Sequence, residues 1–158
     1  MISVDTAVQL TDLSRRTLWR RIGDGEIQRG KNDARGRAMI ELEAIRQLIT
    51  VPLEPSDWMV IEKADAGAAD AQNDTAMLFL SAGKPRCAVY WLENAAKQDY
   101  SDAMQLLATC YMAGTGVAKD EHLGLMWLAK AAAKGHVIAR EQIAAILKAI
   151  PSKGTDSP

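Results

Sequence analysis

The residues with the clearest potential for chemistry are cations gathered in one short stretch, Ser14 to Gly23. At 100° per residue, Leu18 and Ile22 fall on one side of a helix, whereas Arg16 and Arg20 point to the opposite side. Guanidinium groups on one face can donate hydrogen bonds to phosphate oxygens. The stretch therefore predicts a short helix with a dry face for packing and a basic face for an anionic partner.

The elements that must position this helix are short. Ser14 is a suitable N-cap, and the glycine-bearing residues 23–25 end the helix. So short a helix is not stable alone in water, and its apolar side must pack on a neighbour. Upstream, Ser3 can cap a second helix over residues 4–10, followed by a tight turn at Thr11-Asp12. The order is helix, turn, basic helix.

The residues that follow predict a small hairpin and one more helix. Ile27 to Arg29 and Arg37 to Ile40 can pair around the polar loop of residues 30–36. Apolar residues at helical spacing then predict a helix from Glu41 to Ile49.

Residues 1 to 49 resemble the MerR and phage-excisionase type of winged helix-turn-helix. In that family Ser/Thr-x-x-Thr-Leu-aromatic-Arg opens the recognition helix, as Ser14 to Arg20 do here, and an arginine-tipped wing follows. Asp12 stands where the family usually has glycine, but aspartate tolerates the left-handed conformation. Trp19, on the helix flank, is expected to pack against the wing. The resemblance implies contact with double-stranded DNA through Arg15, Arg16, Thr17, Arg20, Arg21, Arg29, Lys31, Asn32, Arg35 and Arg37.

The charge is unevenly distributed along the chain. The net charge is only −1, yet residues 14–37 hold eight Lys or Arg against three acids, and residues 51–158 hold ten against thirteen. This asymmetry indicates an anionic partner at one end only.

The sequence shows no pattern typical of an enzyme. It has no paired carboxylates in a defined frame, no phosphate-binding glycine loop and no nucleophile-base constellation. Cys87 and Cys110 lie in apolar helical patterns and are expected to be buried free thiols, while His122 and His136 are expected at the surface or as caps. We therefore expect no catalysis, no cofactor and no metal.

With 48% apolar and 25% charged residues, the composition is that of a soluble globular protein. No apolar run is long enough to cross a membrane, and the first residues do not form a signal peptide. A cytoplasmic protein without a membrane partner is expected.

Two prolines mark a predicted domain boundary. Pro52 and Pro55 stop the preceding helix and favour an extended connection. We divide the chain into a first domain at residues 1–50, a linker at 51–55, a helical solenoid at 56–150 and a flexible tail at 151–158. Trp58 is the residue expected to bridge the two domains.

The second half of the chain repeats itself. Residues 90–99 align with 126–135 at an offset of 36, whereas the preceding copy is four residues shorter. Each copy predicts two helices, at 71–80 and 86–98 and then at 103–112 and 121–134. Residues 56–66 match a second helix and 137–150 a first helix, so we expect six helices stacked as three pairs. Trp91 and Trp127 occupy the same position and are expected in the core.

The second copy is similar to the Sel1-like repeat, a relative of the tetratricopeptide repeat. The residues that carry the similarity are Ala103, Leu107, Tyr111, Gly114, Gly116, Val117, Lys119, Asp120, Trp127, Ala131, Ala132 and Gly135. The family implies protein-protein interaction on the inner surface of a curved solenoid.

The expected fold is thus mainly α: a small winged helix-turn-helix with a two-stranded wing, followed by a solenoid of helical hairpins. The expected function is that of a bacterial-type regulator of transcription, which binds duplex DNA and a protein partner. Two alternatives are an excisionase-like recombination accessory factor and a pure protein-protein adaptor with a degenerate winged helix. The sequence leaves the oligomeric state open.

Overall fold

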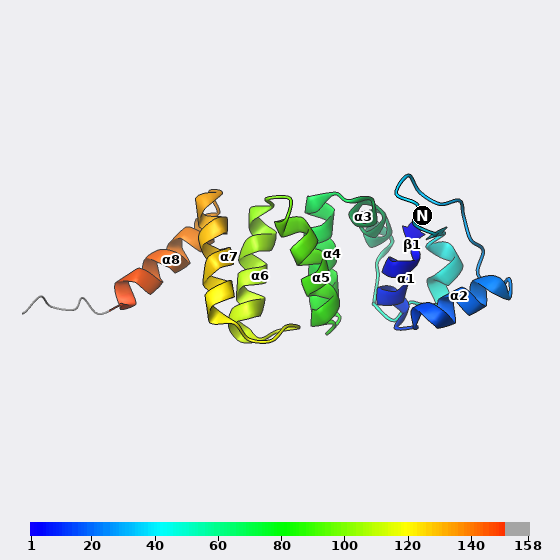
Figure 1. Cartoon of the computed structure of the whole chain (residues 1–158), viewed down its shortest axis with the longest axis horizontal. Helices are drawn as coiled ribbons and strands as arrows, with labels where there is room; N and C mark the ends of the chain where they lie inside the picture. The colour runs from blue at the N-terminus through cyan, green and yellow to red at the C-terminus, as the bar shows by residue number, and fades with distance from the viewer. Residues whose placement is uncertain (151–158) are drawn as a thin grey trace, which may run out of the picture.

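The computed structural model describes residues 1–150 and shows helices arranged in a row, with a small mixed unit at one end (Figure 1). The predicted tail at 151–158 lies outside the described residues. The elements are β1 (Ile2–Ser3), α1 (Val4–Thr11), α2 (Arg15–Gly23), β2 (Met39–Ile40), the 3₁₀ helix η1 (Glu43–Leu48), α3 (Pro55–Ala66), α4 (Ala69–Ser81), α5 (Pro85–Ala96), α6 (Ser101–Ala113), α7 (Glu121–Ala133) and α8 (Val137–Ala149).

The first two helices form as their caps predict. The Ser3 hydroxyl accepts a hydrogen bond from the Thr6 N–H at 3.3 Å, and the Ser14 hydroxyl accepts one from the Thr17 N–H at 3.0 Å. Asp12 ends α1 with φ of 57°, in the left-handed conformation expected for this turn. The predicted sequence of helix, tight turn and basic helix is therefore present.

The predicted hairpin between residues 27–29 and 37–40 is wrong. The two-stranded sheet instead joins β1 to β2, with Ile2 opposite Ile40, and only an isolated bridge between Arg29 and Ile40 links the predicted strands. Pairing with β1 places Ile2 and Ile40 together in the core, where both are fully buried. The loop of residues 30–36 is polar, so strand pairing there would bury no comparable apolar surface.

The predicted helix from Glu41 to Ile49 forms only as the shorter 3₁₀ helix η1. The Ile45 N–H donates to the Leu42 carbonyl at 3.2 Å, a spacing of three residues instead of four. The tighter turn buries Ile45 completely. Ile49, which follows it, is extended, and the Thr50 N–H donates to the Leu10 carbonyl at 2.9 Å.

The segment predicted as a linker, residues 51–55, is buried at its first residue and mostly exposed after it. Val51 is only 5% exposed, and α3 begins at Pro55, one residue earlier than the predicted boundary. Proline is well suited to the first position of a helix, because its missing N–H has no partner there in any case. The Glu54 N–H donates to the Asp57 carboxylate at 2.8 Å, which completes the start of the helix.

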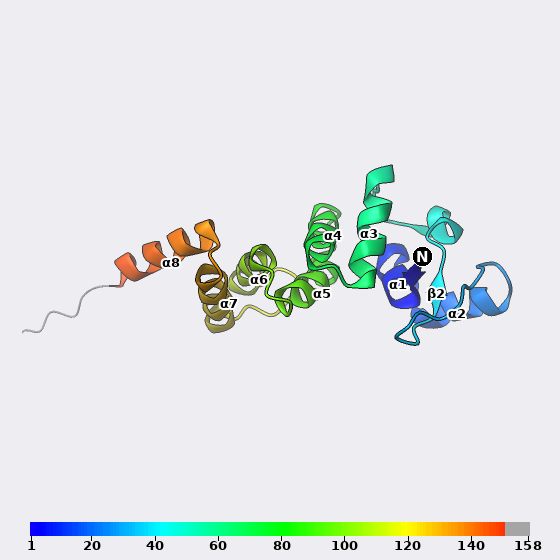
Figure 2. The same cartoon turned by 90° about the horizontal axis from the view of Figure 1, so that it is seen from above.

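The solenoid has the six predicted helices, α3 to α8. Figure 2 shows α5 and α7 along one side of the row and α4 and α6 along the other. The helices α3, α5 and α7, which are the second helices of their pairs, are each followed within three residues by a residue with positive φ. These residues lie at the repeat offsets of 32 and 36: Gly67 at 114°, Asp99 at 64° and Gly135 at 94°. The helices α4 to α7 form two complete hairpins, whereas α3 and α8 are single helices at the two ends.

Small residues allow the helices of the solenoid to approach closely. A Cβ added to Gly124 of α7 would lie 3.1 Å from the Ala108 carbonyl oxygen of α6. Gly116 has φ of 75°, and a Cβ there would lie 2.4 Å from the Pro85 carbonyl oxygen, so this loop rests directly on the start of α5. The glycines of the second copy are thus explained by backbone contact.

The two equivalent tryptophans differ in burial. Trp91 is 2% exposed and lies in the core as predicted. Trp127 is only half-buried, with the Lys130 ammonium 4.6 Å from its ring centre, so its prediction as a core residue holds only in part. One further helix, α8, follows α7, and it does not enclose Trp127 as the second repeat encloses Trp91.

Candidate functional site

Three of the cations predicted for DNA contact are exposed and unengaged. Arg16 and Arg20 lie on the outer face of α2, and Lys31 lies in the loop that follows. Among residues 1–150, none of the three has an ion-pair partner or a side-chain hydrogen bond. Their charges are therefore available to an anion.

Three other predicted residues of α2 are partly engaged within the protein. Arg15 forms an ion pair with Asp5, and Arg21 lies 3.5 Å from the Glu26 carboxylate. The Thr17 hydroxyl lies 2.8 Å from the Ser14 hydroxyl and belongs to the helix cap. These contacts lie at both ends of α2 and reduce the capacity of the three side chains to bind an external partner.

Arg29 and Asn32 contact each other beside Trp19. The Arg29 guanidinium donates to the Asn32 side-chain oxygen and stands 5.5 Å from the centre of the Trp19 ring. Trp19 remains 39% exposed. The predicted packing of Trp19 against the loop region is present, but it is a single stacked contact and not a buried one.

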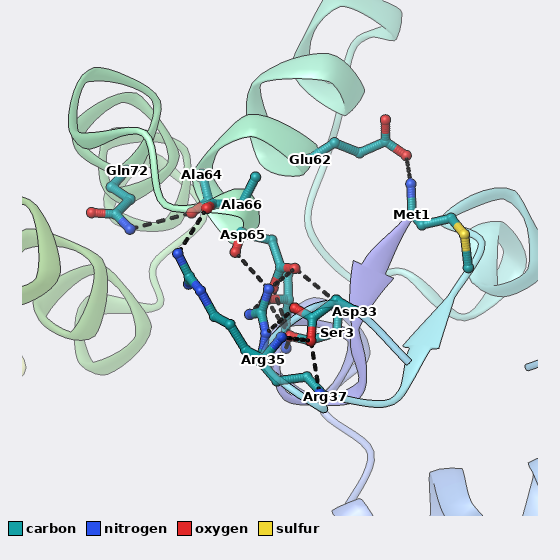
Figure 3. Close-up of polar contacts among 11 residues, drawn as sticks. Met1, Ser3, Asp33, Arg35, Arg37, Glu62, Ala64, Asp65, Ala66 and Gln72 are labelled. Carbon is teal, nitrogen blue, oxygen red and sulfur yellow. Dashed lines mark hydrogen bonds and ion pairs between the residues drawn. The ribbon is translucent and has the colours of Figure 1, made fainter. Parts of the chain in front are cut away.

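Arg35 and Arg37 point towards Asp65 and Ala66 at the end of α3, as Figure 3 shows. Arg35 donates to the Ala66 carbonyl at 3.2 Å. The Arg37 guanidinium lies 2.7 Å from Asp33 and 3.2 Å from Asp65. Both side chains therefore have partners within the protein, and their assignment as DNA contacts stays a prediction.

Burial of the Arg37 guanidinium works against its charged form. The hydrogen bond to Asp33 and the negative charges of Asp65 and Asp33 outweigh this effect, so the pKa of Arg37 lies above its usual value. The Arg37 guanidinium is therefore a cation that two carboxylates hold in place within the protein.

Asp65 is the centre of this polar contact, and the sequence did not reveal it. Its carboxylate is 2% exposed and accepts from the Ser3 hydroxyl at 2.6 Å, the Ser3 N–H at 3.1 Å and the Thr6 hydroxyl at 2.5 Å, as well as from Arg37 (Figure 3). A buried carboxylate is tolerated when a cation and several donors surround it. Asp65 thus fastens α3 to β1, α1 and the loop.

The special role of Asp65 can be recognised when the same position is compared between the repeats. Its equivalents are Lys97, the residue directly after α5, and Ala133 of α7, and both are exposed. The helices α5 and α7 are each preceded by the first helix of their repeat, α4 or α6. No such helix precedes α3, so the residues before α3 cover this position instead. A surface position in two repeats becomes a buried anchor in the third.

A second contact joins the solenoid to the turn between α1 and α2. The Lys84 ammonium lies 2.6 Å from the Asp12 carboxylate and 2.5 Å from the Thr50 hydroxyl. Hydrogen bonds from Lys84 and then Thr50 hold the pKa of Asp12 below its usual range. Nearby, the Arg46 guanidinium stands 5.2 Å from the ring centre of Trp58, the residue expected to bridge the two parts.

The Asp12 contact predicts a small pH-dependent contribution to stability. Because the pKa of Asp12 is lowered in the folded state, the contribution is present above the ordinary value of 3.8 and is lost as the pH falls through the folded value. Asp12 is 60% exposed, so we expect Asp12→Asn to cost well under about 1 kcal/mol at pH 6 and still less at pH 3. Urea unfolding of both proteins at the two pH values measures the difference. A penalty that is equal at pH 3 and pH 6 would contradict the role of the ionised carboxylate.

The solenoid exposes two large apolar side chains at one repeat position. Tyr90 of α5 is 47% exposed and Met126 of α7 is 40% exposed. They are 36 residues apart, the offset of the repeats, and lie on helices on the same side of the row (Figure 2). We call Tyr90 and Met126 the apolar pair.

The cysteines are not placed for chemistry. Cys110 is buried and Cys87 is half-buried, and burial raises the pKa of both thiols. His136 accepts the Ala139 N–H at 3.1 Å and caps α8, as predicted. Within residues 1–150, no three His, Cys, Asp or Glu side chains are grouped to hold a metal ion, and no helix is long and apolar enough to span a membrane.

The row of paired helices defines this part of the chain as a helical repeat solenoid. Residues 69–100 and 101–136, which contain these two hairpins, match the family model of the Sel1 repeat. Among solved structures, that of a Sel1 repeat protein from Oxalobacter formigenes is similar, with a TM-score of 0.53 and 26% identity over 90% of this chain and 90% of that chain. No curated protein matches the sequence. The predicted resemblance to Sel1-like repeats is confirmed for 69–136, and the family match does not extend to the winged helix-turn-helix predicted at the start.

Proposed function

We propose that this chain is a protein-binding adaptor whose Sel1 repeats hold a partner protein over the apolar pair. Sel1 repeats imply a role in protein-protein interaction, which supports the adaptor over DNA-dependent regulation as the main function. The observation that carries the proposal is the exposure of Tyr90 and Met126 at one repeat position.

The apolar pair stays exposed although the hairpin cores beside it are closed. The neighbouring core residues Trp91 and Leu128 are each 2% exposed, and Tyr90, which contacts the Trp91 ring edge-on, keeps 47% of its own surface exposed. Exposure of a large apolar side chain to water is unfavourable, and the free energy falls when a partner covers the side chain. Aromatic residues and methionine are enriched in the cores of protein interfaces. The pair is therefore suited to seat an apolar segment of a partner.

Site-specific crosslinking tests this function. A photoreactive residue placed at position 126 should crosslink to a partner protein in cells, whereas the same residue at position 77, which is also exposed but lies on α4, should not. With the partner purified, Tyr90→Glu combined with Met126→Glu should weaken binding by about 30-fold or more, because charges would be buried in the interface. Met77→Glu is the matched control. Equal losses for the pair and the control would contradict the assigned surface.

A second candidate function is DNA contact through α2, favoured by the three unengaged cations Arg16, Arg20 and Lys31. Three phosphate contacts predict a slope of log K against log salt of about −3. Replacing Arg16 and Arg20 with alanine should abolish duplex binding in a gel shift, while Arg46→Ala, outside this face, should not. A shift that is absent at low salt would leave the adaptor as the function. If binding is present, an effect on promoters would distinguish a regulator from an excisionase-like factor.

A further inference from the structure

A hollow of about 440 Å³ lies where η1, the segment that follows it and the start of α3 meet. Its walls are mostly apolar and are formed by Ile49, Val51, Leu53, Pro55 and Trp58. Val51 is buried, whereas Ile49, Leu53 and Trp58 are half-buried and keep part of their apolar surface open. Hollows of this size, with apolar walls and a few polar groups, are typical of small-molecule sites, and such sites often lie between two parts of a chain.

Two side chains of opposite charge line the same hollow, Glu43 and Arg46 of η1. The Arg46 Nη1 atom lies 3.3 Å from a carboxylate oxygen of Glu43, and the Arg46 guanidinium stands 5.2 Å from the centre of the Trp58 ring. The side chains of Arg46 and Glu43 are 65% and 64% exposed, and an ion pair that is so exposed contributes little to stability. A ligand can therefore separate the two charges at little cost and pair with both of them.

We propose that this hollow binds a free α-amino acid with a large apolar side chain. Glu43 pairs with the ammonium group of the ligand. Arg46 pairs with its carboxylate, to which a planar guanidinium can donate two parallel hydrogen bonds. The apolar side chain of the ligand lies against the apolar walls and leaves water. The proposal is independent of the adaptor function, because the hollow lies at η1 and α3 and the apolar pair lies on α5 and α7.

The opposite charges of Glu43 and Arg46 favour a zwitterion over a ligand with a single charge. A carboxylate without an ammonium group competes with Glu43 for Arg46 and lies beside a like charge. An amine without a carboxylate meets the Arg46 guanidinium in the same unfavourable way. Repulsion of the wrong ligand contributes to specificity as much as attraction of the right one. The apolar walls discriminate in turn against a small side chain, which removes little apolar surface from water.

Calorimetric titration of the full chain with L-phenylalanine tests the site. We expect a dissociation constant on the order of 0.1–1 mM, as is usual for so small a ligand. L-Alanine, which lacks the ring, should bind at least about 30-fold more weakly. The ligands 3-phenylpropanoate, which lacks the ammonium group, and 2-phenylethylamine, which lacks the carboxylate, should each bind at least about tenfold more weakly than L-phenylalanine.

Two charge variants make the test specific to Glu43 and Arg46. Glu43→Gln should weaken the binding of L-phenylalanine by about tenfold and strengthen that of 3-phenylpropanoate by about fivefold, because it removes the like charge. Arg46→Gln should weaken L-phenylalanine equally and strengthen 2-phenylethylamine instead. Glu121→Gln breaks another exposed ion pair, with Lys119 before α7, and is the matched control that should leave every constant unchanged.

Circular dichroism checks that each variant keeps its helices. An ion pair with a structural role alone would not exchange the preference between the two singly charged ligands. Absence of L-phenylalanine binding up to about 10 mM would overturn the proposal. So would equal affinities for L-phenylalanine and 3-phenylpropanoate, or a Glu43→Gln variant that keeps the preference of the natural sequence.

Discussion

Replacing Asp65 with alanine should lower the free energy of unfolding by about 3–5 kcal/mol, the usual cost of breaking a buried charge pair from one side. The substitution removes the acceptor for the Ser3 and Thr6 hydroxyls and leaves the Arg37 guanidinium without its buried partner. Arg37 keeps Asp33 and is 29% exposed, which favours the lower end of the range. Urea unfolding followed by circular dichroism measures the loss.

The matched control for this prediction is Asp70→Ala, a carboxylate that is exposed at the start of α4. It should change stability by less than about 0.5 kcal/mol, as surface substitutions usually do. If the two variants lose equal stability, Asp65 does not hold the N-terminal residues to the solenoid. Asp65→Asn should recover little, because an amide cannot accept from all the donors that the carboxylate satisfies.

The same contacts bear on the predicted division at residues 51–55. A fragment ending near Thr50 lacks Asp65 and Lys84, and a core of about 50 residues is marginal on its own. We expect this fragment to be unfolded alone and to regain structure when α3 is included. The division into two domains remains a prediction that these fragments would test.

The second large effect is expected at Trp91. Trp91→Ala should cost about 3–5 kcal/mol, whereas Trp127→Ala at the same repeat position should cost about 1–2 kcal/mol. The difference follows from burial, since Trp91 is 2% exposed and packs edge-on against Tyr90 at 5.3 Å, while Trp127 is half-buried. The Trp91 indole N–H is buried without an acceptor, which places its loss towards the lower end of the range.

Thermal unfolding of the two single variants measures this contrast. Equal losses would mean that the second repeat is as closed as the first and that the end of the solenoid at α8 is tighter than the structure shows. The same comparison tests whether the equivalent tryptophans of the two repeats contribute equally to the core.

The features that the sequence could predict are local or periodic. Ser3 and Ser14 predict where their helices begin, because an N-cap side chain accepts a hydrogen bond from a residue only three positions away. The offsets of 32 and 36 place α4 to α7 to within about two residues, because repeats impose the same packing on each copy. The left-handed Asp12 was predictable from its side chain for the same local reason.

The features that the sequence could not predict depend on pairing across the chain. β2 pairs with β1, although residues 27–29 are nearer in sequence, because the pairing buries Ile2 and Ile40. Arg35 and Arg37 were assigned to DNA from their charge and from the resemblance to a wing, and their partners in α3 lie about thirty residues away. An arginine that is fixed inside a protein and one that binds phosphate have the same local sequence signal.

One measurement tests the main proposal most directly. The partner protein that crosslinking identifies is purified, and calorimetry determines its affinity for three forms of the full chain. The forms are the natural sequence, the double variant Tyr90→Glu and Met126→Glu, and the double variant Arg16→Ala and Arg20→Ala. We predict that the first double variant loses binding by about 30-fold or more, because it places charge within the apolar pair, and that the second binds the partner as the natural sequence does. Unchanged binding by the first variant, or loss of binding by the second, would contradict a protein-binding site on the Sel1 repeats.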